Sequence, residues 1–343
     1  MTGSPPRAPG RAPISVADAF FEPSALRARR LDARMRARLA ESVRYIASQI
    51  GDALEVPGAP LAGLLARLED GPVSPHAFGA YADLVLALET DDRTRATQHL
   101  GDLLAAPAVR GGPRILALGD SARDRNADRV RRHVDSDPER PLAILPPSPE
   151  VAAAGRARVE SALRRLARGH PALSAEIRAL LREIVLAVGP SDPGAWSFDG
   201  ASSFMLWGAV VLNAAGSPSA LETIQALAHE SAHNLLFGLG VDGPLVEKVG
   251  LERFPSPLRV DARPIDGIFH ATFVTARMQH AVTSLRAAGA LEPAERDEAE
   301  QVLAGNAALF AKGLATLDRH AKLTPLGEAV LAGARAMMER CAW

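Results

Sequence analysis

The chain has 343 residues, of which 47% are hydrophobic and 23% are charged, and its formal net charge is -1 at pH 7. This composition is that of a globular protein and excludes extensive disorder. The near-neutral charge gives no basic field for nucleic acid or anionic lipid, so we expect neither partner. The only cysteine, Cys341, excludes an internal disulfide and a thiolate metal cluster within one chain.

Residues 1–12 are rich in Pro, Gly and Arg and contain no apolar run. They have the composition of a flexible tail, and they lack the apolar core of a secretory signal. No apolar stretch elsewhere in the sequence is long enough to span a bilayer. We therefore expect a soluble, cytoplasmic protein without a membrane partner.

Residues 13–147 are predicted to form a mostly helical N-terminal region. Between residues 26 and 50, apolar residues recur at three- and four-residue spacing, with arginines on the opposite face. Helix breakers divide the following segments at Gly51, Gly58, Gly71 and Asp91. Short apolar runs predict strands at 114–118 and 142–145, and the charged stretch between them is expected to be solvated helix or loop.

Residues 148–343 are predicted to form a metal-binding catalytic domain. A strand is expected at 184–188, and a second apolar run covers 204–212. Helical patterns cover 149–168, 172–182, 218–236, 264–286, 293–317 and 326–339. The expected fold class is α+β with helices dominant, including a zincin-like strand followed by the helix that carries the metal motif.

The motif His229-Glu230-Ser231-Ala232-His233 carries the chemistry of this domain. Two histidines at i and i+4 lie one turn apart on the same helix face, which suits two ligands of one metal ion. The side chain of Glu230 is rotated beside them, toward the coordination sphere. Two structural histidines beside a glutamate are the alternative interpretation, and such an arrangement is rarer. The motif therefore predicts a metal but does not identify it.

A third ligand must come from elsewhere, because two histidines do not complete a catalytic metal site. The metzincin pattern is excluded, since Leu236 and Leu239 stand where it needs Gly and a third His. His270 is the preferred third ligand, although a lone histidine in an apolar segment is more often a core residue. The remaining candidates are Glu252, Glu247, Asp261 and Asp266. The other histidines have polar or loop surroundings and are expected at the surface: His76, His99, His133, His170, His280 and His320.

Arg277 lies seven residues after His270, so the two side chains project from nearly the same helix face. A guanidinium there could bind a carboxylate in bidentate fashion beside the metal. Arg263 and Arg259, just before this helix, are further candidates for that role. The alternative is that all three are surface residues of an arginine-rich chain.

Three runs of sequence between about residues 204 and 280 resemble a known family. They are Gly208-Ala-Val-Val-Leu-Asn213, Ala226-Leu-Ala-His-Glu-Ser-Ala-His-Asn-Leu-Leu236 and Arg263-Pro-Ile-Asp-Gly-Ile-Phe-His-Ala-Thr-Phe-Val-Thr-Ala-Arg277. This segment is similar to the HExxH-motif peptide-modification proteins of ribosomally synthesised, post-translationally modified peptide (RiPP) pathways. Many peptidases share the His-Glu-x-x-His element, so the specificity of the resemblance rests on the Arg-Pro-x-x-Gly-x-x-His segment.

The resemblance implies an Fe(II)- and 2-oxoglutarate-dependent peptide β-hydroxylase, built without a cupin barrel. His229, His233 and His270 fall where the metal-binding histidines of that family are expected. The assignment of Arg277 or Arg263 to 2-oxoglutarate comes from helix geometry and not from the family. The implied partner is a precursor peptide, and a homodimer is compatible with the sequence.

Two other functions stay open from the sequence. In a zinc metallopeptidase, Glu230 would act as general base on a zinc-bound water, and residues 204–212 would form an edge strand that pairs with an extended substrate. In the hydroxylase, Glu230 would instead orient a ligand or a water. The third alternative is a non-catalytic, metal-stabilised partner in a peptide-modifying complex, which nothing in the sequence supports positively.

Overall fold

The computed structural model describes residues 12–50, 54, 56–119, 124–135, 141–190, 198–216, 219–247, 250, 252–259 and 261–341. The chain divides into two compact units, each assembled from segments that are distant in sequence. The first unit comprises Met1–Pro13, Arg29–Ala152 and Leu181–Ala215, and the second comprises Ile14–Ala28, Ala153–Leu180 and Gly216–Trp343. The α+β class with dominant helices is confirmed. The predicted tail lies almost entirely outside the described residues.

Helices form most of the first unit. They are α1 (Ala25–Ile50, which enters this unit at Arg29), α2 (Gly58–Asp70), α3 (Pro75–Glu89), α4 (Arg93–Leu104) and α5 (Arg125–Val134). The predicted helix over residues 26–50 is confirmed. Two caps explain where helices begin: the Ser74 hydroxyl accepts a hydrogen bond from the His76 amide at 3.3 Å, and the Asp92 carboxylate accepts one from the Arg95 amide at 3.0 Å.

A four-stranded sheet forms the rest of the first unit, in the order β1-β2-β4-β3. The strands are β1 (Arg114–Ala117), β2 (Glu183–Ala187), β3 (Gly200–Ser202) and β4 (Ala209–Asn213). β1, β2 and β4 are parallel, and β3 pairs with β4 in antiparallel direction. β4 therefore has hydrogen-bonded neighbours on both sides. The expected edge strand within residues 204–212 is wrong, because β3 covers that edge.

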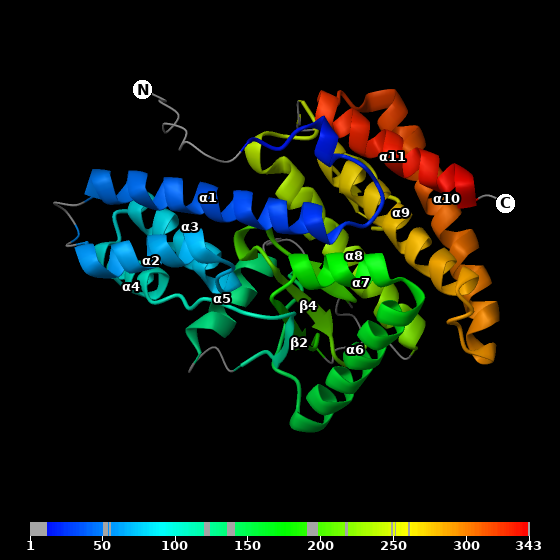
Figure 1. Cartoon of the computed structure of the whole chain (residues 1–343), viewed down its shortest axis with the longest axis horizontal. Coiled ribbons are helices and arrows are strands. Elements are labelled where there is room, and N and C mark those ends of the chain that lie inside the picture. The colour runs from blue at the N-terminus through cyan, green and yellow to red at the C-terminus, as the bar shows by residue number, and fades with distance from the viewer. Residues whose placement is uncertain are drawn as a thin grey trace. The chain divides into compact units, whose positions relative to one another are not determined.

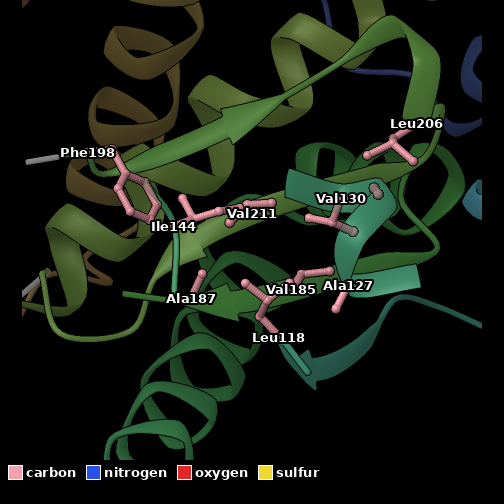
Figure 2. Packing of buried hydrophobic residues seen from close by; sticks show 10 residues of the cluster. Leu118, Ala127, Val130, Ile144, Val185, Ala187, Phe198, Leu206 and Val211 are labelled. Atoms are coloured by element: carbon pink, nitrogen blue, oxygen red, sulfur yellow. The ribbon is translucent and has the colours of Figure 1, made fainter. Parts of the chain in front are cut away.

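One face of this sheet carries a core of small and β-branched side chains. Val185 of β2 and Val211 of β4 point to the same face, where Ala127 and Val130 of α5 pack against them (Figure 2). The alternate residues of β2 are equally buried, as is usual for parallel strands. The predicted strand at 142–145 is wrong: only Leu145 forms a bridge, to Val188, and Ala143 adopts a φ of 47° that breaks an extended run.

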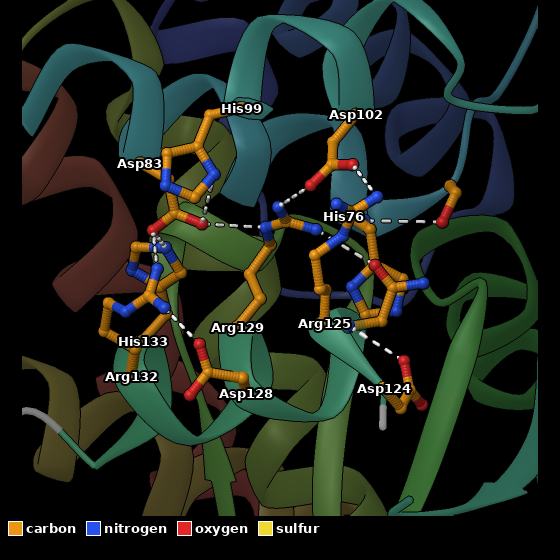
Figure 3. Close-up of polar contacts among 12 residues, drawn as sticks. His76, Asp83, His99, Asp102, Asp124, Arg125, Asp128, Arg129, Arg132 and His133 are labelled. Atoms are coloured by element: carbon orange, nitrogen blue, oxygen red, sulfur yellow. Dashed lines mark hydrogen bonds and ion pairs between the residues drawn. The ribbon is translucent and has the colours of Figure 1, made fainter. Parts of the chain in front are cut away.

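Asp83 of α3 is the centre of a buried polar cluster in the first unit (Figure 3). Its carboxylate accepts hydrogen bonds from Arg129 at 2.8 Å and from Arg132 at 2.5 Å, and it lies 3.0 Å from His133 Nε2. Burial alone would raise the pKa of Asp83, but the hydrogen bonds from His133, Arg132 and Arg129 hold that pKa below its ordinary value. Part of the densely charged stretch before residue 140 therefore forms a helix, α5, whose Arg129 and Arg132 bind Asp83 of α3.

The described part of the second unit is helical apart from a two-stranded hairpin and an isolated bridge between Val246 and Leu323. Its helices are α6 (Pro149–Gly169, mostly in this unit), α7 (Pro171–Leu180), α8 (Ala220–Leu239), α9 (Ile265–Ala287), α10 (Arg296–His320) and α11 (Pro325–Cys341). The hairpin pairs β5 (Phe254–Pro255) with β6 (Ala262–Arg263). α9 packs against α8, α10 and α11, and Figure 1 shows it beside the last two. None of the described helices combines the length and apolar character needed to cross a bilayer.

Two glycines mark close approaches in this unit. A Cβ atom at Gly313 of α10 would overlap the Thr272 hydroxyl of α9, and one at Gly327 of α11 would overlap the backbone carbonyl oxygen of Leu245. The Thr272 hydroxyl can turn away if it gives up its hydrogen bond to the Ile268 carbonyl, whereas the Leu245 carbonyl is part of the backbone and also accepts a hydrogen bond from the Thr324 amide. Gly327 is therefore the less replaceable of the two.

We expect Gly327→Ala to lower the free energy of unfolding by about 2 kcal/mol, because the added methyl displaces backbone. Gly305→Ala is the matched control, since Gly305 is exposed on α10 and has nothing within 4 Å of its added Cβ. The control should stabilise the protein by roughly 0.5 to 1 kcal/mol through helix propensity. Urea unfolding measures both values, and equal midpoints for the two variants would contradict the packing described.

Candidate metal centre

The histidine motif lies on α8, which begins and ends at well-defined residues. The Ser219 hydroxyl caps the helix by accepting a hydrogen bond from the Glu222 amide at 3.0 Å, and it donates one to Glu298 of α10 at 2.6 Å. The helix ends with Gly240 as its C-cap residue. His229 and His233 therefore sit in the regular middle of the helix, one turn apart, with their ring centroids separated by 4.8 Å.

His270 of α9 lies beside these two histidines, and its role as a third metal ligand stays a prediction. His233 Nε2 lies 3.1 Å from His229 Nε2, and His233 Nδ1 lies 3.1 Å from His270 Nδ1. The planes of the His233 and His270 rings differ by only 23°, and both rings contact Phe237. Packing of α9 on α8 thus brings together three imidazoles that are far apart in the sequence.

Met278 completes this row of contacts, and the sequence analysis missed it. His229 Nδ1 lies 3.4 Å from the Met278 sulfur. Because His270 contacts the later histidine of α8 and Met278 contacts the earlier one, α8 and α9 run antiparallel here. The available signal was the i, i+8 spacing from His270, which keeps Met278 on the same side of α9.

All three imidazoles are held in their neutral form, which is the form that binds metals. Burial, with a smaller effect from Arg259, lowers the pKa of His229 to about 4. Burial likewise lowers the pKa of His270 to about 4, against the opposing charge of Asp266, and it holds the pKa of His233 well below its ordinary value. The rings still reach solvent, since 25% of the His229 side chain is exposed.

The donor atoms form a row and do not converge on one point. His233 presents a different ring nitrogen to each of its two neighbours. Among the described residues, no group of three or more His, Cys, Asp or Glu side chains is arranged as a ready metal cage. Capture of one ion by all three histidines would therefore require a ring to turn.

Glu230 lies beside His229 in this row. Its Oε1 atom is 3.8 Å from His229 Nε2, and only 4% of its side chain is exposed. Since His229 is neutral near pH 7, this contact is not an ion pair under those conditions. A carboxylate here is placed to orient a water or a ligand beside the histidine nitrogens.

The alternative third ligands have different surroundings. Asp261 forms an ion pair with Arg263 at 2.6 Å. Asp266, one turn before His270, accepts a hydrogen bond from the Gly267 amide at 2.9 Å, and its charge acts on His270. Glu252 and Glu247 are exposed. His270 is the candidate that directly contacts the motif histidines.

Arg277 is committed to a buried ion pair. Its guanidinium binds the Glu176 carboxylate of α7 and donates a hydrogen bond to the Phe21 carbonyl at 2.9 Å. Glu176 also binds Arg27 at 2.7 Å, so one carboxylate is shared by two guanidiniums. Arg277 and Glu176 are each 1% exposed. The role of Arg277 in binding 2-oxoglutarate stays a prediction, and it would require the guanidinium to leave Glu176.

Five of the six histidines that were expected at the surface are buried or partly buried, and only His320 of these six is exposed. His99 and His133 pack on Asp83, and His76 lies 3.2 Å from the buried Glu183. The remaining pair, His170 and His280, contact each other with ring centroids 4.7 Å apart. That expectation failed because local polarity in sequence does not show that a carboxylate or aromatic ring from another helix covers the imidazole.

The functional interpretation of the histidine row rests on its geometry alone. No protein-family model matches the chain, and no curated protein matches it in sequence. The family resemblance noted for residues 204–280 therefore stays a hypothesis that rests on the motif residues themselves.

We expect Arg277→Gln to lower the free energy of unfolding by about 3 kcal/mol, because it removes one partner of a buried ion pair. Arg286→Gln is the control: Arg286 lies on the same helix, is 41% exposed and pairs with the exposed Glu300, so its loss should cost less than about 1 kcal/mol. Thermal or urea unfolding without any ligand measures the difference. If Arg277→Gln is as stable as the control, the ion pair has no structural role and the cosubstrate role gains weight.

Proposed function

We propose that this protein is a metal-dependent peptide hydroxylase that uses Fe(II) and 2-oxoglutarate and belongs with the HExxH-motif RiPP modification proteins. The observation that carries the proposal is the position of His270, which lies beside His233 in the row that also contains His229. A peptidase motif alone supplies two histidines, whereas the third imidazole matches the pattern that the hydroxylase family implies. The substrate would be a precursor peptide.

The residues present fit such a metal. Two nitrogen ligands about 2.1 Å from one ion lie roughly 3 Å apart, which is the separation of the His229 and His233 Nε2 atoms, 3.1 Å. Neutral imidazoles suit iron, zinc and copper alike. His270 would become the third ligand by rotation of its ring, since its Nδ1 atom now faces His233. When bound, Fe(II) together with 2-oxoglutarate supplies dioxygen activation for insertion of an oxygen atom into a C–H bond.

The protein residues would perform the surrounding work. His229, His233 and His270 hold the ion at a partly exposed position that a peptide can reach. Phe237 contacts two of the three rings and limits the water that surrounds them. Glu230 would orient a ligand or a water, without acting as an obligatory base.

Arg259 is our preferred partner for the distal carboxylate of 2-oxoglutarate. It is exposed, and its positive charge lowers the pKa of both His229 and His233, so its field reaches the row. Of the three candidate arginines, Arg259 is the one whose charge acts on both motif histidines. A carboxylate that pairs with its guanidinium would therefore lie toward the histidine row.

A zinc peptidase is the second candidate. The placement of Glu230 near His229 Nε2 favours it, because a general base is needed next to a zinc-bound water. The pairing of β4 on both sides makes β3, and not residues 204–212, the outer strand on that side of the sheet, so the strand pairing does not decide between the two enzymes. The support for the hydroxylase is the third imidazole, His270.

Anaerobic titration with Fe(II) and 2-oxoglutarate tests the proposal. The wild-type protein should develop a visible charge-transfer band and bind about one iron per chain, and His270→Ala should lose both. His320→Ala is the control, since His320 is exposed at the end of α10. In air, a precursor peptide encoded beside this gene should gain one oxygen atom as succinate forms.

The opposite outcome is equally definite. Tight zinc binding without any band, together with peptide cleavage that Glu230→Gln abolishes, would establish the peptidase and refute the hydroxylase. Loss of metal retention in Glu252→Ala but not in His270→Ala would overturn the ligand assignment.

The role of Arg259 has its own test. Arg259→Gln should weaken 2-oxoglutarate binding by at least tenfold, because one charged hydrogen bond is worth about 1.5 kcal/mol or more. Fe(II) retention should be unchanged. Arg286→Gln, an exposed arginine on α9, should alter neither quantity. Equal 2-oxoglutarate affinities in the two variants would exclude Arg259 as its partner.

A further inference from the structure

The row Met278, His229, His233, His270 is joined by three contacts between polar atoms. The contacts are 3.4 Å from sulfur to His229 Nδ1, 3.1 Å from His229 Nε2 to His233 Nε2, and 3.1 Å from His233 Nδ1 to His270 Nδ1. The carboxylate of Glu230 lies 3.8 Å from His229 Nε2, beyond hydrogen-bond distance. The row is therefore a chain of hydrogen bonds with Met278 at one end.

The chain of three imidazoles by itself has two consistent proton arrangements. A neutral imidazole has one N–H donor and one acceptor nitrogen, so each contact between rings needs a donor on one side only. If His229 donates to His233, then His233 must donate to His270. If His229 instead accepts from His233, then His233 must accept from His270. Nothing within the three rings selects the direction.

The thioether at the end removes this freedom. A methionine sulfur accepts hydrogen bonds and cannot donate them. His229 must then carry its proton on Nδ1, His233 on Nε2 and His270 on Nδ1. The lone pairs left over are those of His229 Nε2, His233 Nδ1 and His270 Nε2, and only the last lies outside the hydrogen-bonded chain.

We infer that Met278 is a positioning residue that sets the tautomers of all three histidines and, by holding the His229 proton on Nδ1, keeps His229 Nε2 unprotonated. His229 can bind an ion through Nε2 while it continues to donate to Met278, so its tautomer does not change. His233 must move its proton from Nε2 to Nδ1 before its Nε2 atom can bind the same ion. The consequence for metal affinity rests on the proposed function, whereas the tautomer pattern does not.

Nuclear magnetic resonance of metal-free protein labelled with ¹⁵N-histidine tests the assignment at pH 8, where an ordinary imidazole with pKa about 6.5 is already neutral. Long-range ¹H–¹⁵N spectra, assigned by single His→Gln variants, should show protonated Nδ1 in His229 and His270 and protonated Nε2 in His233. Met278→Leu should give mixed tautomers at all three rings. Met278→Glu places a carboxylate at that position, which only accepts hydrogen bonds while it is ionised, and in the ionised form it should preserve the wild-type pattern.

Met337→Leu is the matched control, because Met337 is a buried methionine of the same unit whose sulfur accepts a hydrogen bond from the Cys341 thiol at 3.4 Å. Zn(II) titration of the same proteins should show that Met278→Leu weakens zinc binding roughly tenfold, as loss of a ligand-orienting partner does. Met337→Leu should retain wild-type affinity. In the zinc-loaded wild type, the proton of His233 should have moved while that of His229 stays.

Two results overturn the inference. Protonated Nε2 in His229 of the wild type would reverse the chain, and an unchanged tautomer pattern in Met278→Leu would show that the sulfur sets nothing. If none of the proteins binds metal but the tautomers follow the expected pattern, the proposed function fails and the role of Met278 in the metal-free protein stands.

Discussion

The packing of α8 against α9 is the constraint on which the candidate site depends. The motif on α8 supplies His229 and His233, but the third imidazole and the thioether both come from α9. α9 is surrounded by α8, α10 and α11, so most of its surface is buried and its rotation is restricted. A shift of α9 by one residue would turn His270 away by about 100° and leave the motif with two histidines.

The shared carboxylate of Glu176 contributes to that restriction. It binds Arg277 of α9 and Arg27 of α1, and it also accepts a hydrogen bond from the Ser24 amide at 2.7 Å. Two guanidiniums on one buried carboxylate leave a net positive charge, which is costly unless the remaining donors are satisfied. The Phe21 and Phe20 carbonyls accept from Arg277 and Arg27, respectively, while the buried Nε atom of each of these arginines has no hydrogen-bond partner. Arg277 therefore contributes to the position of His270 even if it never contacts a cosubstrate.

Periodicity predicted the helices well and the burial of polar groups poorly. The breaks at Gly58, Gly71 and Asp91 were readable because turn residues act locally. By contrast, α9 has no polar stripe to reveal which side holds His270, and its partner lies on another helix. His133 and His99 were expected at the surface because sequence does not show that Asp83 lies across from them. Local sequence patterns do not show which charged groups from distant segments pair with each other.

The hydrogen bonds among the three histidines determine what the row must give up to bind a metal ion. In the metal-free row each histidine nitrogen that faces a neighbour has a partner, so the three rings are stable without an ion. Binding of one ion by all three rings would require the His270 ring to turn and the proton of His233 to move from Nε2 to Nδ1. A site built this way exchanges internal hydrogen bonds for metal bonds, and that exchange reduces its affinity relative to a cage formed in advance. The fixed direction at Met278 lets His229 bind an ion through Nε2 without a change of tautomer, and it leaves His270 Nε2 as the nitrogen whose lone pair lies outside the hydrogen bonds of the row.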